Sequence, residues 1–162
     1  MNEHELAQII QSVVRSVDQP AGHSTVADVT LDMAKKLIAA VEQRAAQMGV
    51  NAVIAVANKG ANPVAVHCMD NSYIASYDIA FNKAYTCAAL KMPTTTLKQL
   101  AQPGGDLYGI QHTNNGRIVI FGGGIPIMKD GVCIGGLGVS GGSEAQDTEL
   151  AESAQSVIDS LF

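Results

Sequence analysis

Glycine is concentrated in one stretch of this chain, and that stretch limits what the chain can fold into. Ten of the 16 glycines lie between Gly116 and Gly142. Glycine weakens a strand, so it is retained where a backbone or a ligand has to approach closely. Aromatic residues make up only 4% of the chain and tryptophan is absent, so the core must consist of Ala, Val, Ile, Leu and Met. We expect this stretch to lie against a ligand, a neighbouring strand or another subunit.

The composition indicates one globular domain and argues against several classes of protein. With 162 residues, 47% apolar and 15% charged, the chain can bury a core. The net charge of −5 argues against a nucleic-acid-binding surface, which would be basic. No apolar run approaches the roughly 20 residues that span a bilayer, and the N-terminus lacks a secretory signal pattern. Three cysteines without a CxxC pair indicate neither a zinc ribbon nor a disulfide framework, so we expect a cytoplasmic protein.

Residues 1–17 have the pattern of an amphipathic helix, and residues 18–29 form a linker rich in turn-forming residues. The apolar stripe of the helix consists of Leu6, Ile9, Ile10, Val13, Val14 and Val17. An isolated helix of about 16 residues is marginal in water, so this stripe needs a partner. The helix either folds back on its own domain or serves as a detachable address. Its polar face lacks the lysine and arginine enrichment of membrane-surface helices.

Residues 30–162 are expected to form one α/β (α+β) domain. Periodicity and capping signals predict helices over 31–48, 73–90, 94–101 and from about 144 to the C-terminus. Short apolar runs predict five strands, over 52–57, 63–69, 117–121, 125–128 and 132–139. Turns at Asn58–Asn62 and at Lys129–Gly131 make hairpins of the first and last pairs of strands. Hairpins join antiparallel strands, so the sheet should be mainly antiparallel and covered by helices.

Lys83 is the most unusual candidate site residue, because it lies on or near the alanine-rich face of a predicted helix. Its ammonium group could reach solvent, hold an anionic group of a ligand, or pair with a buried carboxylate. The candidate carboxylates are Asp70, Asp78 and Asp147. Gly141 and Gly142 open the last helix, whose free N–H groups could bind a carboxylate or propionate. A plain capped helix is the alternative reading of these two glycines.

Histidine and cysteine provide candidate ligands for a haem iron. Neighbouring strand residues face opposite ways, so His67 and Met69 share one face of the second strand and Cys68 takes the other. His112 lies in a predicted loop. His67, Cys68 or His112 could be an axial ligand, and each could instead be packed or solvated. The sequence contains no HExxH, G-x-S-x-G, P-loop or dinucleotide fingerprint, and it predicts no catalytic residue.

The run from Ile118 to Asp147 resembles the signature of the GlcG/HbpS family of haem-binding domains, which includes the C-terminal domain of PduO-type cobalamin adenosyltransferases. The family pattern falls on Gly123-Gly124, Pro126, Gly131, Ile134-Gly135, Gly138 through Gly142 and Gln146-Asp147. Further similar motifs are Asn82-Lys83-Ala84, Pro93-Thr94, Pro103-Gly104 and Leu107-Tyr108-Gly109. The last two resemble a subgroup found in diol- and glycerol-dehydratase gene clusters. The N-terminal helix resembles the encapsulation peptides of bacterial microcompartment cargo.

This resemblance implies an antiparallel five-stranded sheet flanked by helices, of the profilin/PAS sandwich type, in a homo-oligomer that binds haem or cobalamin. The expected cofactor-binding residues are His67, Cys68, Asp70, Lys83, His112, Gly123, Gly124, Gly141 and Gly142. The family commonly has Arg-Met-Asp where this chain has Cys68-Met69-Asp70. A contact between that arginine and a propionate would therefore be lost here, or replaced by a thiolate ligand.

These patterns favour one function over two alternatives. We expect a protein that binds haem or a corrinoid and that supports cobalamin-dependent diol or glycerol metabolism as cargo in a microcompartment lumen. The N-terminal helix would bind the shell or other cargo. One alternative is a haem-degrading or corrinoid-reducing enzyme, which would need an electron donor although the sequence has no flavin or CxxC site. The other is a structural or assembly protein with a vestigial pocket.

Overall fold

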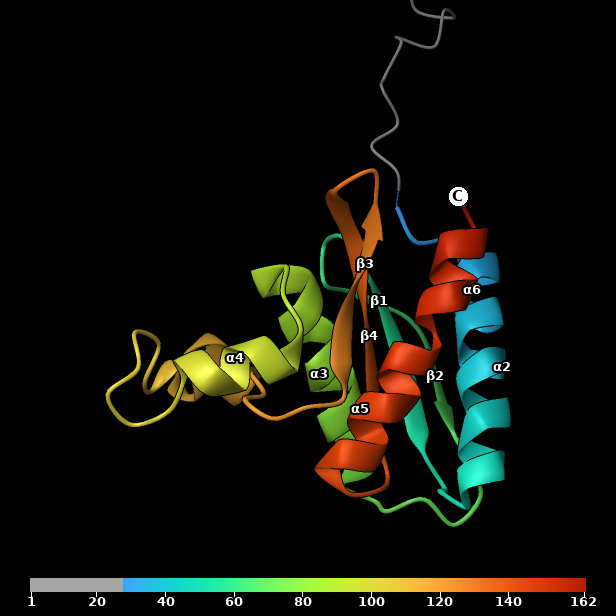
Figure 1. Cartoon of the computed structure of the whole chain (residues 1–162), viewed down its shortest axis with the longest axis horizontal. Helices are drawn as coiled ribbons and strands as arrows, with labels where there is room; N and C mark the ends of the chain where they lie inside the picture. Colours follow the sequence, from blue (N-terminus) through green and yellow to red (C-terminus); the bar gives the residue numbers. More distant parts are fainter. Residues whose placement is uncertain (1–27) are drawn as a thin grey trace, which may run out of the picture.

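The computed structural model describes residues 28–162, which form an antiparallel sheet between two layers of helices (Figure 1). The helices are α2 (Leu31–Met48), α3 (Ser76–Leu90), α4 (Thr94–Leu100), α5 (Glu144–Ser153) and α6 (Gln155–Ser160), with short 3-10 helices η1 (Ile110–His112) and η2 (Asn114–Gly116). The strands are β1 (Val53–Asn58), β2 (Pro63–Cys68), β3 (Gly124–Lys129) and β4 (Val132–Ser140). The predicted N-terminal helix, and all but the last two residues of the predicted linker, lie outside the described residues.

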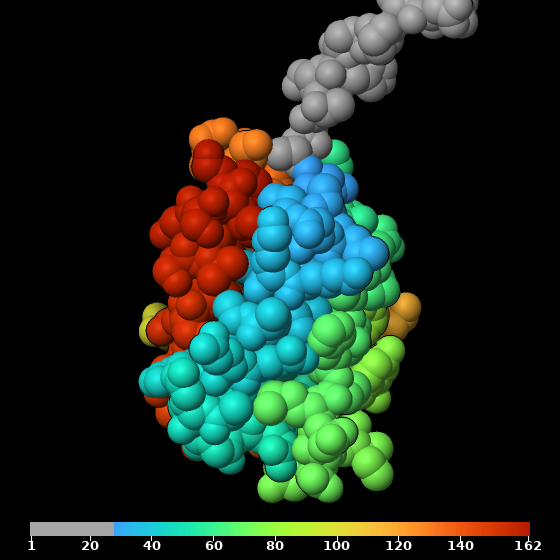
Figure 2. Space-filling model, turned by 90° about the vertical axis from the view of Figure 1, so that its right-hand side faces the viewer, coloured from blue at the N-terminus to red at the C-terminus, as the bar shows by residue number. Residues whose placement is uncertain are grey.

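The sheet has the order β2-β1-β4-β3, and every neighbouring pair is antiparallel. Helix α3 packs on one face, while α2, α5 and α6 pack on the other. The core on the α2 side holds the larger aliphatic side chains, and the core on the α3 side is built mainly from alanine and valine. Figure 2 shows α2 and the C-terminal helices lying side by side over their face of the sheet. The predicted helix-flanked antiparallel sheet is confirmed.

Local sequence signals account for the ends of several elements. The Thr30 hydroxyl accepts from the Met33 N–H and caps α2, and Gly49 ends that helix with a positive φ of 68°. The two residues between β3 and β4, Asp130 and Gly131, both have positive φ, as a two-residue hairpin turn that matches the strand twist requires. Among residues 28–162, no helix is both long and apolar enough to cross a membrane.

The glycines of β4 allow the backbone of α3 to approach the sheet. A Cβ added at Gly136 would lie 2.2 Å from the carbonyl oxygen of Ala84, and one added at Gly138 would lie 2.1 Å from that of Ala80. These distances are far below van der Waals contact, so no residue with a Cβ fits without moving the helix. The close approach expected for the glycine-rich stretch is therefore made, at these two positions, to the backbone of α3.

The predicted fifth strand over 117–121 is wrong, because this segment packs against a helix and joins no strand. Its Val119 N–H donates to the Thr86 hydroxyl of α3 (3.0 Å). Ile118 is buried, and the Arg117 guanidinium lies 3.6 Å from the centre of the Tyr85 ring on α3. Side chains of α3 thus hold the segment in place without a neighbouring strand. An apolar run of this length fits either environment, which explains the wrong prediction.

Three helices differ from prediction at their boundaries. Helix α4 ends at Leu100, one residue earlier than expected. Helix α3 begins at Ser76, three residues later than expected, and Ala75 before it provides no side-chain cap. The C-terminal helix is broken into α5 and α6 at Ala154. The segment that holds α4, η1 and η2 lies on the side of the sheet away from α2 (Figure 1).

Replacing Gly138 by alanine should destabilise the domain by about 3 kcal/mol or more, because the new methyl group must displace the backbone of α3. The matched control is Val132→Ala in the exposed first position of the same strand, which should cost less than about 1 kcal/mol. Urea unfolding of the two variants measures both free energies. Equal costs would contradict the close packing of β4 on α3.

Candidate functional site

A buried ion pair connects the two helical layers. Lys83 on α3 is fully buried, and its Nζ donates to Asp147 Oδ2 on α5 (2.9 Å) and to the Val139 carbonyl oxygen of β4 (2.8 Å). Helices α3 and α5 lie on opposite faces of the sheet, so the pair crosses from one layer to the other. Of the three partners considered for Lys83, the structure selects Asp147.

Asp147 also accepts hydrogen bonds from backbone N–H groups of the glycine loop between β4 and α5. Its Oδ1 accepts from the N–H groups of Gly141 (3.1 Å) and Gly142 (2.8 Å). The next amide, that of Ser143, donates to Gln146 Oε1 (2.9 Å) in a capping box. The amides at which we predicted an anionic ligand group therefore already bind a carboxylate and an amide oxygen of the chain itself.

Gly123 and Gly124 leave the space that the buried lysine occupies. A Cβ added at Gly123 would lie 2.6 Å from Lys83 Nζ, and one added at Gly124 would lie 2.8 Å from the Cys87 sulfur. Gly123 also has a φ of 107°, which side chains rarely adopt. The Phe121 ring lies over the ammonium group, with 4.9 Å from Nζ to the ring centre. The structure thus gathers Lys83 and the four predicted glycines around one ion pair.

Burial and pairing act in opposite directions on the Lys83 ammonium. Desolvation lowers the pKa of Lys83, and the charge and hydrogen bond of Asp147 oppose that shift. Burial also raises the pKa of the Cys87 thiol to about 12, so this cysteine is neutral and poorly nucleophilic. Glu144 accepts from Lys98 (2.7 Å) and from the Gly122 N–H (2.8 Å), and these hydrogen bonds lower the pKa of its carboxyl group. The pair is therefore flanked by an inert thiol and an ionised surface carboxylate.

The predicted iron ligands do not lie around the ion pair. His67 is on the edge strand β2, and its Nδ1 is 2.9 Å from Glu42 Oε1 on α2. A carboxylate can only accept, so Nδ1 carries a proton, and in the neutral imidazole the lone pair is therefore on Nε2. Cys68 and Asp70 are exposed at the end of the same strand. The structure therefore keeps these three residues together, apart from Lys83 and the glycines.

His112 lies in a third place, the short helix η1 beyond α4. Its side chain is exposed, and Nε2 lies 3.4 Å from the side-chain nitrogen of its neighbour Gln111. The nine predicted cofactor-binding residues thus fall into three separate regions of the fold. Within residues 28–162, no three His, Cys, Asp or Glu side chains are grouped so that they could hold a metal ion.

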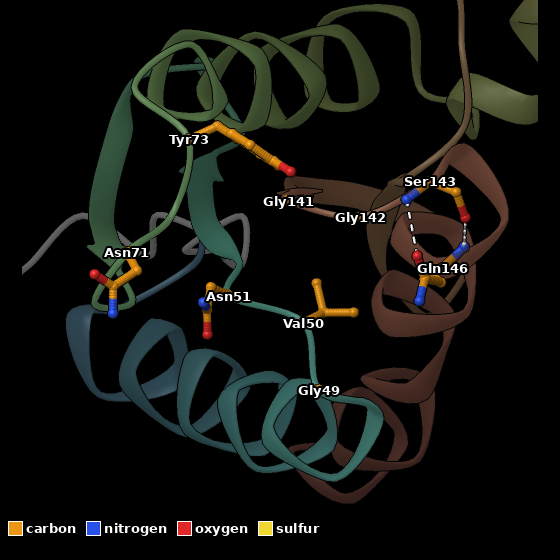
Figure 3. Close-up of a pocket in the computed structure, with 9 residues that line it drawn as sticks. All are labelled: Gly49, Val50, Asn51, Asn71, Tyr73, Gly141, Gly142, Ser143 and Gln146. Carbon is orange, nitrogen blue, oxygen red and sulfur yellow. Dashed lines mark hydrogen bonds between the residues drawn. The ribbon is translucent and has the colours of Figure 1, made fainter.

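Two pockets have both Gly141 and Gly142 in their lining, and sequence reasoning missed most of their side chains. The smaller, about 270 Å³, lies beside the ion pair and includes Asp147, Phe121 and Ile79. The larger, about 490 Å³, is shown in Figure 3 and is lined by Gly49, Val50, Asn51, Asn71, Tyr73, Gly141, Gly142, Ser143 and Gln146. All of them except Gln146 of α5 come from three connections far apart in the sequence. Apart from Gly141 and Gly142, which the sequence singled out, no local pattern indicated that these residues line a pocket.

Removing one partner of the ion pair should be strongly destabilising. Asp147→Ala leaves a buried ammonium with only the Val139 carbonyl, so we expect a loss of about 3–5 kcal/mol in the free energy of unfolding. Lys83→Met should cost less, because Asp147 keeps two N–H donors. Urea unfolding of both variants and of the double variant measures the coupling, and the double variant should cost less than the sum. Additive costs would show that the two groups do not act as a pair.

Comparison with known proteins places the chain in one family. Residues 29–156 match the family model described as "Haem degrading protein HbpS-like". The chain is 46% identical over 129 residues to an uncharacterized 15.0 kDa protein from the dhaT–dhaS intergenic region of Citrobacter freundii, covering 80% of this chain and 91% of that protein. It is 37% identical over 123 residues to the corrinoid adenosyltransferase PduO of Salmonella typhimurium. That match covers 76% of this chain and only 37% of PduO.

Solved structures with the same fold support this assignment. The Klebsiella pneumoniae protein ORFY superposes with a TM-score of 0.82 at 39% identity, covering 87% of this chain and 97% of ORFY. The structure of a PduOC–heme complex superposes with a TM-score of 0.76 at 34% identity, covering 79% of this chain and 93% of PduOC. The predicted resemblance is thereby confirmed, and the chain belongs to the HbpS-like family.

Proposed function

We propose that this protein binds haem through His67. The observation that carries the proposal is the likeness to PduOC, which was crystallised with heme and shares 34% of its sequence with this chain over most of the domain. Membership of a family described as haem-degrading points to the same ligand. Haem would supply an iron centre whose reactivity depends on its axial ligand and surroundings.

The side chains of the described residues fit a prosthetic group better than a bare metal ion. A protein-bound metal ion needs several ligands from the chain, and no such group exists among residues 28–162. A haem iron has four ring nitrogens already and needs only one or two side chains. His67 can be such a side chain, because no described residue forms a hydrogen bond with its Nε2.

Glu42 prepares His67 for this role. The Nδ1–H···Oε1 contact of 2.9 Å fixes the tautomer that leaves Nε2 free, and it orients the ring. Metal-ligating histidines commonly have such a carboxylate partner. Neither Cys68 nor His112 has a comparable contact: the Cys68 thiol is exposed, and the His112 ring touches only its neighbour Gln111. Of the three predicted axial ligands, His67 is therefore the one that we assign.

A second copy of the chain would complete the site. His67 is 47% exposed on an edge strand, so a haem bound there would have one face open to water. A flat, apolar ring is stabilised when both faces are covered. Two copies meeting at β2 could cover both faces, and this arrangement would account for the predicted homo-oligomer.

Haem degradation is the second candidate, because the family description names it. Oxidative opening of the ring consumes molecular oxygen and electrons, so the reaction needs an external reductant. The described residues of this chain contain no disulfide that could store electrons. An added reductant such as ascorbate would therefore have to start the reaction.

Delivery to a bacterial microcompartment is the second part of the proposal. It rests on the amphipathic pattern of residues 1–17 and on their resemblance to encapsulation peptides. The apolar stripe of that segment would bind the shell or other cargo, and the haem-binding domain would be carried into the lumen. Cobalamin-dependent diol or glycerol metabolism remains the pathway that the resemblance favours.

Absorbance titration of the ligand-free protein with hemin should give a Soret shift that saturates at a fixed stoichiometry. His67→Ala should weaken binding at least tenfold and change the position of the band, because the axial nitrogen is lost. Glu42→Gln should weaken it by roughly tenfold or more through its effect on the His67 ring. Adding ascorbate and oxygen to the complex tests turnover, which would appear as irreversible loss of the Soret band.

Cys68→Ser and His112→Ala are the matched controls and should bind hemin like the wild type. Wild-type affinity of His67→Ala, or no saturable shift for the wild type, would refute the assignment. The same titration with cob(II)alamin decides between the two tetrapyrroles. A spectral change with the corrinoid alone would transfer the function to cobalamin.

Deleting residues 1–20 should abolish co-purification with microcompartment shells and leave hemin binding unchanged. A finer variant is Ile10→Glu with Val14→Glu, which places two charges in the apolar stripe. Gln8→Glu with Gln11→Glu adds the same charge outside the stripe and should still co-purify. If the deleted protein still co-purifies with shells, the segment is not the address.

A further inference from the structure

The larger pocket lies at one end of the sheet, where three connections meet (Figure 3). Gly49 to Asn51 join α2 to β1, Asn71 and Tyr73 lie between β2 and α3, and Gly141 to Ser143 join β4 to α5. In Figure 3, the Tyr73 side chain extends over the pocket toward Gly141, and Asn51 and Gln146 lie on its other sides. The proposed haem ligand His67 is not among the lining residues.

Several polar groups of this pocket form no hydrogen bond with another described residue. Within residues 28–162, the side-chain amides of Asn51 and Asn71 and the hydroxyl of Tyr73 form no hydrogen bond. Gln146 uses its amide oxygen for the Ser143 N–H, and its amide nitrogen forms no hydrogen bond with a described residue. The Ser143 oxygen accepts from the Gln146 N–H, so its own proton remains available. The pocket thus presents both donors and acceptors to a ligand.

The charges around the pocket disfavour an anionic ligand. None of its nine lining residues is an acid or a base. The backbone amides of the glycine loop, which could have held an anion, donate to Asp147 and Gln146 instead. The C-terminal end of α2 faces the pocket through Gly49 and has no basic residue in its last turn, so its partial charge is negative. A bound anion would therefore lack a positive partner.

A cationic ligand has no carboxylate partner among the lining residues either. A charge removed from water without an opposite charge is unfavourable, whereas neutral hydroxyl and amide groups can pair with the amides and hydroxyls present. A volume of about 490 Å³ is within the range of small-molecule sites. We propose that this pocket binds a small uncharged compound that carries hydroxyl or amide groups, at a site separate from the haem.

Three probes of equal shape and different charge test the proposal: acetamide, acetate and acetamidinium. Each is titrated into ¹⁵N-labelled full-length protein, with myo-inositol as a polyhydroxylated probe. Acetamide or myo-inositol should shift the amide resonances of Asn51, Asn71, Gly142 and Ser143 in a saturable way, and the response of the two probes distinguishes an amide from a hydroxyl ligand. Acetate and acetamidinium should give no saturable shift at the same concentrations.

Variants of the exposed lining residues provide the second arm. Tyr73→Phe removes one hydroxyl and should weaken several-fold the binding of whichever neutral probe responds. Asn51→Asp should weaken binding of the same neutral probe about tenfold. This variant should also bind acetamidinium, because the new carboxylate provides the negative partner that the pocket lacks. Asn115→Asp in η2 is the matched control and should leave all affinities unchanged. The proposal is overturned if neither neutral probe saturates, if a charged probe binds the wild type equally well, or if Tyr73→Phe and Asn51→Asp bind like the wild type.

Discussion

Asp147 satisfies more of the fold's polar groups than any other side chain around the ion pair. One carboxylate oxygen binds the Lys83 ammonium from the opposite face of the sheet, and the other binds two amides of the loop that precedes its own helix. An unpaired ammonium at the position of Lys83 would cost several kcal/mol, so α3 and α5 cannot shift independently. Three glycines of the sheet, Gly124 on β3 and Gly136 and Gly138 on β4, leave the space in which the lysine and its helix lie.

Elements specified by neighbouring residues were predictable from the sequence. The caps at Thr30 and Ser143 lie within three residues of the groups that they bind, and the Asp130-Gly131 turn is complete in two residues. The structure of segment 117–121 was not predictable, because Thr86, which stabilises it, is 33 residues from Val119 in the sequence. An apolar run indicates that a segment is buried. It does not indicate whether a neighbouring strand or a helix side chain forms hydrogen bonds with the backbone of that segment.

In the candidate site, too, local features were predictable from the sequence and long-range contacts were not. Lys83 was recognisable from its place on an alanine-rich helix, and its partner was among three carboxylates, yet only the fold selects Asp147. The sequence placed Gly141 and Gly142 directly before a helix, and the structure has them before the N-cap Ser143 of α5, but their amides are not free. The sequence could not reveal that Asp147 Oδ1 accepts hydrogen bonds from both amides, because Asp147 lies six residues after Gly141 and five after Gly142. Asn51, Asn71 and Tyr73 carried no signal, since they meet only when three distant connections converge.

Asp147 pairs with the Lys83 ammonium and accepts hydrogen bonds from the N–H groups of the glycine loop. It therefore also determines what the surrounding surface can bind. The ion pair and the loop therefore offer a ligand neither a free positive charge nor free amides. The polar pocket beside the loop is left with uncharged groups alone. His67, to which we assign the haem iron, contacts Glu42 and lies on an edge strand outside this network. The fold thereby separates the residues that stabilise this end of the sheet from the surface at which we propose haem binding. Substitutions at β2 therefore leave the Lys83–Asp147 pair intact.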